Sequence, residues 1–196
     1  MKDANPSPTE TLFDCLRQLF RQTGQLLMDS DRIMGERGWV PTTSTVTAEY
    51  SGLPYASDRW FPRWAFRFYI PQEPEGEYEE LIDSLKLVSV HFTSDHDTQV
   101  DDPLLVAGYV QCREPVKRKQ VMRPYQAYGY WLCKCWFYGS NKTSGGAWRI
   151  WVPRKFFKDI IQVVATFALP LYDITNSEVL EQKVINRLFE ESPTSP

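Results

Sequence analysis

Three of the four cysteines have a spacing that could bring their thiols together. Cys133 and Cys135 lie two residues apart in a predicted strand, so their side chains share one face. If Val106, Val110 and Cys112 face the same way on a neighbouring strand, three thiols would approach one another. Thiolates so placed could bind zinc or copper or react with oxidants. A structural zinc site usually draws on two tight turns, and buried cysteine also packs as a small apolar residue, so we favour core packing.

Both histidines of the chain lie near two aspartates, in the segment His91 to Asp97. Imidazole and carboxylate together suit divalent ions, so His91, His96 and Asp97 are weak candidates for metal ligands. His91 falls on a predicted strand, whereas Asp95, His96 and Asp97 fall in the turn that follows it. We therefore rank a solvated hairpin loop above a metal site, and keep a carboxylate- or metal-dependent enzyme built on Asp95, His96 and Asp97 as the alternative function.

A basic segment over residues 113–124 could contact anions. The candidate contacts are Lys117, Arg118, Lys119 and Arg123. With the tyrosines that follow, they could hold phosphates and stack on bases of a nucleic acid. We rank a solvated loop first, pairing with the glutamates of residues 73–80 second, and a nucleic-acid accessory function third.

Aromatic residues are the strongest sequence signal for a binding surface. They gather in two places, a proline-bounded segment over residues 39–64 and a run over residues 125–138. Aromatic side chains beside a sheet commonly line a pocket or an interface, although they can also cover an open sheet edge. The predicted surface residues are Trp39, Tyr50, Tyr55, Trp60, Tyr128, Tyr130 and Trp136.

Composition and motifs limit the remaining classes of function. The length of 196 residues, of which 42% are hydrophobic and 14% aromatic, indicates a single globular domain. The net charge of −3 disfavours a globally basic nucleic-acid binder. No apolar run approaches the roughly 18 residues of a membrane span, and residues 1–8 lack a secretory signal pattern. No phosphate loop, nucleophile elbow or dinucleotide fingerprint occurs, so no cofactor is predicted.

The residue pattern also predicts the elements that position these side chains. Ser7, Pro8 and Glu10 form the start signal of a helix over residues 8–34, which Gly24 or residues 29–32 could bend or split. Apolar residues fill most of the circumference of a second, buried helix opening at Pro153 and limited by Pro170, and Thr175 begins a final amphipathic helix. The predicted strands span residues 43–50, 63–70, 85–93, 104–113, 125–138 and 147–152.

Alternation over residues 63–70 indicates one dry and one wetter face of the sheet. The strand at 147–152 should be the last, in a hairpin with the aromatic run. Short links between strands favour antiparallel pairing.

We therefore predict an α+β fold: a curved antiparallel sheet of five or six strands, with a long N-terminal helix and two C-terminal helices packed mainly on one face. Residues 7–191 form the domain, and residues 1–6 and 192–196 are expected to be disordered.

The predicted function is a non-catalytic, cytosolic binding or protein-interaction domain. Its aromatic surface would contact a protein partner or a small ligand. Sensor-like ligand-binding modules share this general layout. Apolar stripes on the first and last helices suit a homodimer. Cys15, Cys112, Cys133 and Cys135 would then be free thiols.

Overall fold

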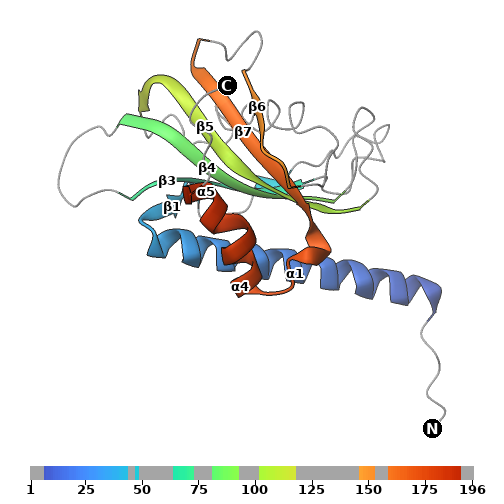
Figure 1. Ribbon diagram of the computed structural model, residues 1–196. Coiled ribbons are helices and arrows are strands. Elements are labelled where there is room, and N and C mark those ends of the chain that lie inside the picture. Colours follow the sequence, from blue (N-terminus) through green and yellow to red (C-terminus); the bar gives the residue numbers. More distant parts are fainter. Residues whose placement is uncertain are drawn as a thin grey trace.

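The computed structural model describes residues 7–43, 47–48, 64–72, 81–92, 102–117, 146–152 and 159–190. One long helix, α1 (Pro8–Glu36), runs along the base of a sheet, and a second helical segment lies beside it near the C-terminus (Figure 1). The chain therefore has the predicted α+β architecture, with an open antiparallel sheet.

Helix α1 begins at the predicted signal and ends at Glu36, two residues later than predicted. The Ser7 side chain accepts a hydrogen bond from the Glu10 amide at 3.2 Å, and the Glu10 carboxylate accepts one from the Ser7 amide at 2.7 Å. This capping box satisfies two amides that a helix start otherwise leaves without partners. Gly38, with a φ of 75°, ends the helix in the left-handed conformation that glycine adopts without strain. The helix is continuous from Pro8 to Glu36, so neither Gly24 nor residues 29–32 split it.

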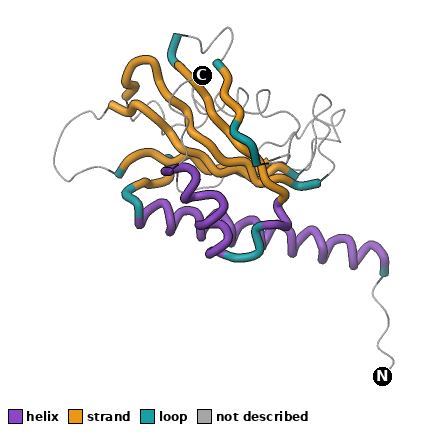
Figure 2. Tube along the Cα trace, viewed as in Figure 1, coloured by secondary structure: helices purple, strands orange, loops and turns teal. Residues whose placement is uncertain are grey.

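The sheet places six strands in the order β1-β3-β4-β5-β7-β6, and a short β2 also pairs with β3. Every pairing is antiparallel. The strands are β1 (Trp39–Pro41), β2 (Thr47–Ala48), β3 (Trp64–Pro71), β4 (Leu81–His91), β5 (Leu104–Lys117), β6 (Arg149–Trp151) and β7 (Ile161–Pro170). Figure 2 shows the strands forming one layer and the helices another.

The predicted helix opening at Pro153 is wrong over its second half, because residues Ile161–Pro170 form strand β7 between β5 and β6. A short apolar run that is buried on all sides has the same pattern in a buried strand and a buried helix. Here residues on both faces of β7 are buried, so the strand carries apolar residues on each face. Strand β6 is consequently not the last strand, and it pairs with β7; the predicted hairpin partner at 125–138 lies outside the described residues.

The two faces of the sheet carry two separate apolar clusters. The helix face packs against α1 and the C-terminal helical segment, and its strand residues include Ala65, Tyr69, Val88, Leu105 and Phe167. The opposite face carries its own buried cluster. Its members include the predicted trio Val106, Val110 and Cys112, and the large side chains Trp64, Phe66, Phe68, Leu85, Leu87 and Ile161.

Strand β3 differs from the expected dry and wetter faces, since seven consecutive residues from Trp64 to Ile70 are buried. Polar residues on its helix face are buried because α1 supplies their partners. Arg67 donates to the Asp31 carboxylate at 2.8 Å and to the Thr43 carbonyl at 2.8 Å. The Tyr69 hydroxyl lies 2.9 Å from both Ser30 Oγ and Asp31 Oδ1. We call Ser30, Asp31, Arg67 and Tyr69 the clamp, because they fix α1 to the sheet.

The C-terminal helical segment begins one residue later than predicted. The Asn176 side chain, rather than that of Thr175, caps it by accepting from the Val179 amide at 2.9 Å. Three contiguous pieces follow, α4 (Ser177–Leu180), a π-helical turn (Glu181–Ile185) and α5 (Asn186–Glu190), after a single 3₁₀ turn (Leu171–Asp173) that leaves β7. One helical segment therefore stands where two helices were predicted.

Candidate functional site

The predicted aromatic surface is represented by Trp39 in the part of the chain that the structure describes. Its half-buried ring lies 6.1 Å from the Phe189 ring, edge-on, and 5.0 Å from the ammonium of the buried Lys86. Lys86 also donates to the Leu188 carbonyl, and burial lowers its pKa to about 8. Trp39 thus helps to fasten the C-terminal helix. The other six residues of that prediction lie outside the described ranges: Tyr50, Tyr55, Trp60, Tyr128, Tyr130 and Trp136.

The cationic candidates also lie mostly beyond the described residues. Lys117 is the last residue of β5, where it pairs with Leu81 of β4. The predicted basic connection is therefore partly strand, because β5 continues four residues past Arg113. Arg118, Lys119 and Arg123 fall outside the described ranges.

The candidate metal and thiol residues occupy the sheet interior where they are described. His91 is buried at the end of β4, and burial lowers its pKa to about 4. Cys112 is buried on β5, where desolvation, assisted by Asp83, raises its pKa to about 11. Asp95, His96, Asp97, Cys133 and Cys135 lie outside the described ranges. Among the described residues, no three His, Cys, Asp or Glu side chains lie close enough to hold a metal ion.

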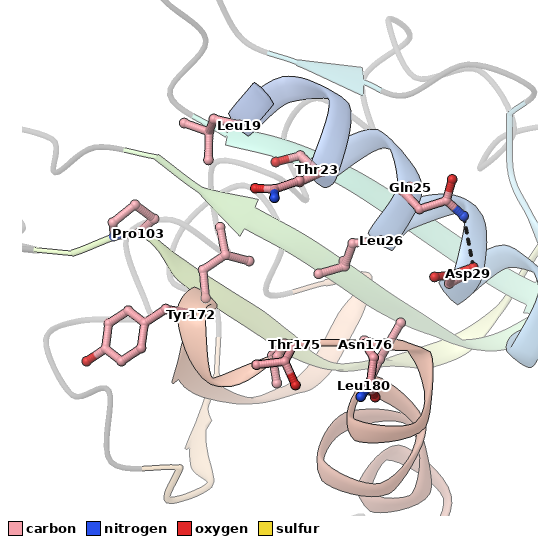
Figure 3. Close-up of a pocket in the computed structure, with 13 residues that line it drawn as sticks. Leu19, Thr23, Gln25, Leu26, Asp29, Pro103, Tyr172, Thr175, Asn176 and Leu180 are labelled. Carbon is pink, nitrogen blue, oxygen red and sulfur yellow. Dashed lines mark hydrogen bonds between the residues drawn. The ribbon is translucent and has the colours of Figure 1, made fainter. Parts of the chain in front are cut away.

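A pocket of about 590 Å³ lies between α1 and the segment that links β7 to α4 (Figure 3). A volume of this size suits a small organic ligand. Helix α1 forms one wall, residues 171–180 form the other, and Pro103 lies at one end. The lining residues are Leu19, Gln22, Thr23, Gln25, Leu26, Asp29, Pro103, Leu171, Tyr172, Ile174, Thr175, Asn176 and Leu180.

Hydrogen bonds within the protein hold both walls of the pocket in place. The clamp fixes α1 two residues beyond Asp29, through Asp31 and Arg67. The second wall is tied down by the Leu171 amide, which donates to the Pro103 carbonyl at 2.8 Å, and by the Asn176 cap. The pocket is therefore formed before any ligand arrives, and such preorganisation lowers the entropic cost of binding.

Inside the pocket the floor is apolar and the rim is polar. Leu180 is fully buried, and Leu19, Leu26, Leu171 and Ile174 are partly buried. Gln22, Gln25, Thr175 and Asn176 are exposed, as is Tyr172 with 65% of its surface accessible. This combination of apolar area and a few polar groups is typical of a ligand site.

One lining group stands out chemically, the Thr23 hydroxyl. Thr23 is only 5% exposed, and its Oγ1 has no hydrogen-bond partner among the described residues. A buried hydroxyl without a partner costs free energy, and most buried side-chain polar atoms are paired. The oxygen itself is sealed from solvent, so a ligand atom or a water in the pocket would pair with it once the Thr23 side chain rotates toward the pocket.

We expect Thr23→Val to raise the free energy of unfolding by about 1–2 kcal/mol, because it removes that unpaired hydroxyl at nearly constant volume. Urea denaturation of the ligand-free protein measures the change. Thr42, which is also buried, provides the matched control for threonine-to-valine replacement. A Thr23→Val protein less stable than wild type would mean that the hydroxyl is already paired.

The sequence patterns contain part of this site. Leu19 and Leu26 belong to the apolar stripe that predicted α1, and Thr23 interrupts that stripe between them. A polar residue in the middle of an apolar stripe is the signal that could have been noticed. The second wall could not be predicted, because residues 161–170 were assigned to a helix and the link after them was therefore misplaced.

Among the described residues that line the pocket, there is no histidine, cysteine or lysine and a single carboxylate, Asp29. Among the described residues, no helix is long and apolar enough to cross a membrane. No family model, no curated protein and no solved structure matches this chain.

Proposed function

We propose that this protein is a non-catalytic binding protein that takes a small, mainly apolar ligand between α1 and residues 171–180. The observation that carries the proposal is the buried Thr23 hydroxyl, which lacks a partner among the described residues inside an otherwise apolar floor. A folded protein retains such a group at a cost in stability, and a ligand that pairs with it would recover that cost.

Two further features support the proposal. The pocket has a volume of about 590 Å³, within the range of small-molecule sites. The part of its lining that the structure describes lacks a nucleophile paired with a base, which favours binding over catalysis. The proposal keeps the binding function predicted from the sequence but moves the site away from the aromatic segments. Cytosolic location, a homodimer and a role for those segments remain predictions.

Filling the pocket with a larger side chain tests the proposal. We expect Leu26→Trp, in the middle of the pocket, to reduce the fluorescence of bound Nile red at least about fivefold at fixed dye concentration, because the indole occupies the ligand volume. Met28→Trp is the matched control, since Met28 lies on the same helix, is 62% exposed and does not line the pocket. It should bind the dye as wild type does.

Leu19→Trp, at one end of the pocket, provides a second blocking variant if circular dichroism shows that Leu26→Trp is misfolded. Dye binding that is equal in both blocking variants and in wild type would refute the pocket as the ligand site. Equal loss in Met28→Trp would also refute it, because the dye would then be reporting a general effect of the new ring.

A further inference from the structure

We infer that the ligand of this pocket is an amphiphilic amine, with an apolar body along the floor and a protonated amino group at Asp29. The inference rests on the proposed function and adds the chemical class of the ligand. It is carried by the order in which the lining residues follow one another along the pocket.

The pocket has an apolar end and a polar end. Leu19, Pro103 and Tyr172 lie together at one end, whereas Asp29 and Asn176 lie toward the other (Figure 3). Ten residues of α1 separate Leu19 from Asp29, which corresponds to about 15 Å along a helix. Leu26 and Leu180 continue the apolar floor toward Asp29, so an elongated ligand would lie with its polar group beside that carboxylate.

Among the described residues that line the pocket, Asp29 is the only charged one. Its Oδ1 accepts a hydrogen bond from the side-chain amide of Gln25, through Nε2, at 3.1 Å. This bond holds the carboxylate in place without neutralising its charge. Oδ2 has no hydrogen-bond partner among the described residues and can accept one from a ligand. Asp29 is partly buried, where a charge-assisted hydrogen bond is stronger than in open water.

The charges around the pocket favour the same class of ligand. Segment 171–180 contains two charged residues, Asp173 and Glu178, and both are acidic. The neighbouring turns of α1 contribute Arg21 and Arg32, which are exposed and do not line the pocket, and Arg32 is paired with Glu36. An anionic ligand would lose its hydration beside Asp29 without gaining a cation from the lining, whereas an ammonium would gain a partner.

Three ligands with one chain and different head groups test the inference: decylamine, decanol and decanoate, each displacing Nile red at neutral pH. We expect decylamine to bind about five- to tenfold more tightly than decanol, the contribution of one charge-assisted hydrogen bond, and decanoate to bind most weakly. Asp29→Asn should reduce the affinity for decylamine to within about twofold of the affinity for decanol. The affinity for decanol itself should stay unchanged.

Asp14→Asn is the control, because Asp14 lies on α1, is 70% exposed and removes the same charge away from the pocket. It should leave the order of the three ligands unchanged. Decanol or decanoate binding as tightly as decylamine would overturn the amine but leave the pocket as a binding site. An equal effect of Asp14→Asn and Asp29→Asn would also overturn it. Failure of all three compounds to displace the dye would count against the proposed function as well.

Discussion

Asp31→Asn is expected to lower the free energy of unfolding by about 3–4 kcal/mol, because it leaves the buried Arg67 guanidinium without its carboxylate. Arg67 is 8% exposed, and its Nε is buried without a hydrogen-bond partner among the described residues. Asparagine keeps only one acceptor oxygen, so its NH2 group would face either Arg67 Nη2 or the Tyr69 hydroxyl, both of which donate to Asp31 in the wild type. The clamp joins α1 to β3, so its loss weakens the whole contact between helix and sheet.

The neighbouring ion pair on the same helix gives the control for this measurement. Arg32 and Glu36 also meet at 2.7 Å, but their side chains are 54% and 58% exposed. Arg32→Gln should therefore change stability by less than about 0.5 kcal/mol. Urea denaturation of both variants measures the difference, and equal effects would contradict the clamp.

A double variant separates the cost of an unpaired charge from the loss of packing. Asp31→Asn combined with Arg67→Met removes both charges, so it should be more stable than Asp31→Asn alone. Simple addition of the two single effects would indicate that the residues do not interact in solution.

Acidification from pH 6.5 to pH 4 should lower the free energy of unfolding by about 3 kcal/mol through His91 alone. Burial lowers the pKa of His91 to about 4, against an ordinary value of 6.5. Its side chain lies on the opposite face of the sheet, near the Trp64 ring at 6.3 Å and within apolar surroundings that disfavour the imidazolium.

The sign follows from the two states. Above pH 6.5 His91 is neutral whether the chain is folded or unfolded, so it does not make the free energy of unfolding depend on pH. Between pH 6.5 and 4 the unfolded chain binds a proton that the folded chain does not, and stability therefore falls as the pH falls.

A variant that cannot take up a proton tests this assignment. His91→Gln should lose that part of the pH dependence, which is measured as the difference in unfolding free energy between pH 7 and pH 4.5. His96→Gln should retain it, because it leaves His91 in place. An unchanged pH dependence in His91→Gln would show that His91 is not buried in its neutral form.

Much of the fold could be predicted because local signals and long-range packing agree. The capping residues and apolar stripe of α1 define that helix without reference to the sheet. Alternating or continuous apolar runs identified the strands now seen as β3, β4 and β5, although β4 starts four residues earlier and β5 ends four residues later than expected. Strand ends are set by pairing with neighbours, and one sequence does not reveal those neighbours.

Strand β7 was mistaken for a helix for a physical reason. Val163, Val164 and Thr166 are β-branched and favour a strand, but the density of apolar residues around them equally fits a buried helix. Pairing with β5 along nine residue pairs decides the outcome, and that partner lies more than forty residues earlier in the chain. The clamp could not be predicted either. On a strand with alternating apolar residues, an arginine such as Arg67 is usually exposed to solvent.

The candidate site was the least predictable part of the molecule. Its two walls come from residues 19–29 and 171–180, which only the folded chain brings together. The aromatic content indicated a surface over residues 39–64 and 125–138, whereas the described pocket lining consists of aliphatic, amide and threonine side chains, Asp29, Pro103 and one tyrosine. Helix α1 serves both the clamp and the pocket, so the residues that stabilise the fold also position the proposed ligand site.

Methyl NMR of the protein titrated with decanol tests the ligand site most directly. The account predicts that the largest chemical-shift changes belong to methyl groups that line the pocket: Leu19, Thr23, Leu26, Leu171, Ile174 and Leu180. Methyl groups of the opposite-face cluster, such as those of Val106 and Val110, should stay unchanged. Changes concentrated on the opposite face, or no changes at the pocket at a saturating decanol concentration, would contradict a ligand site between α1 and residues 171–180.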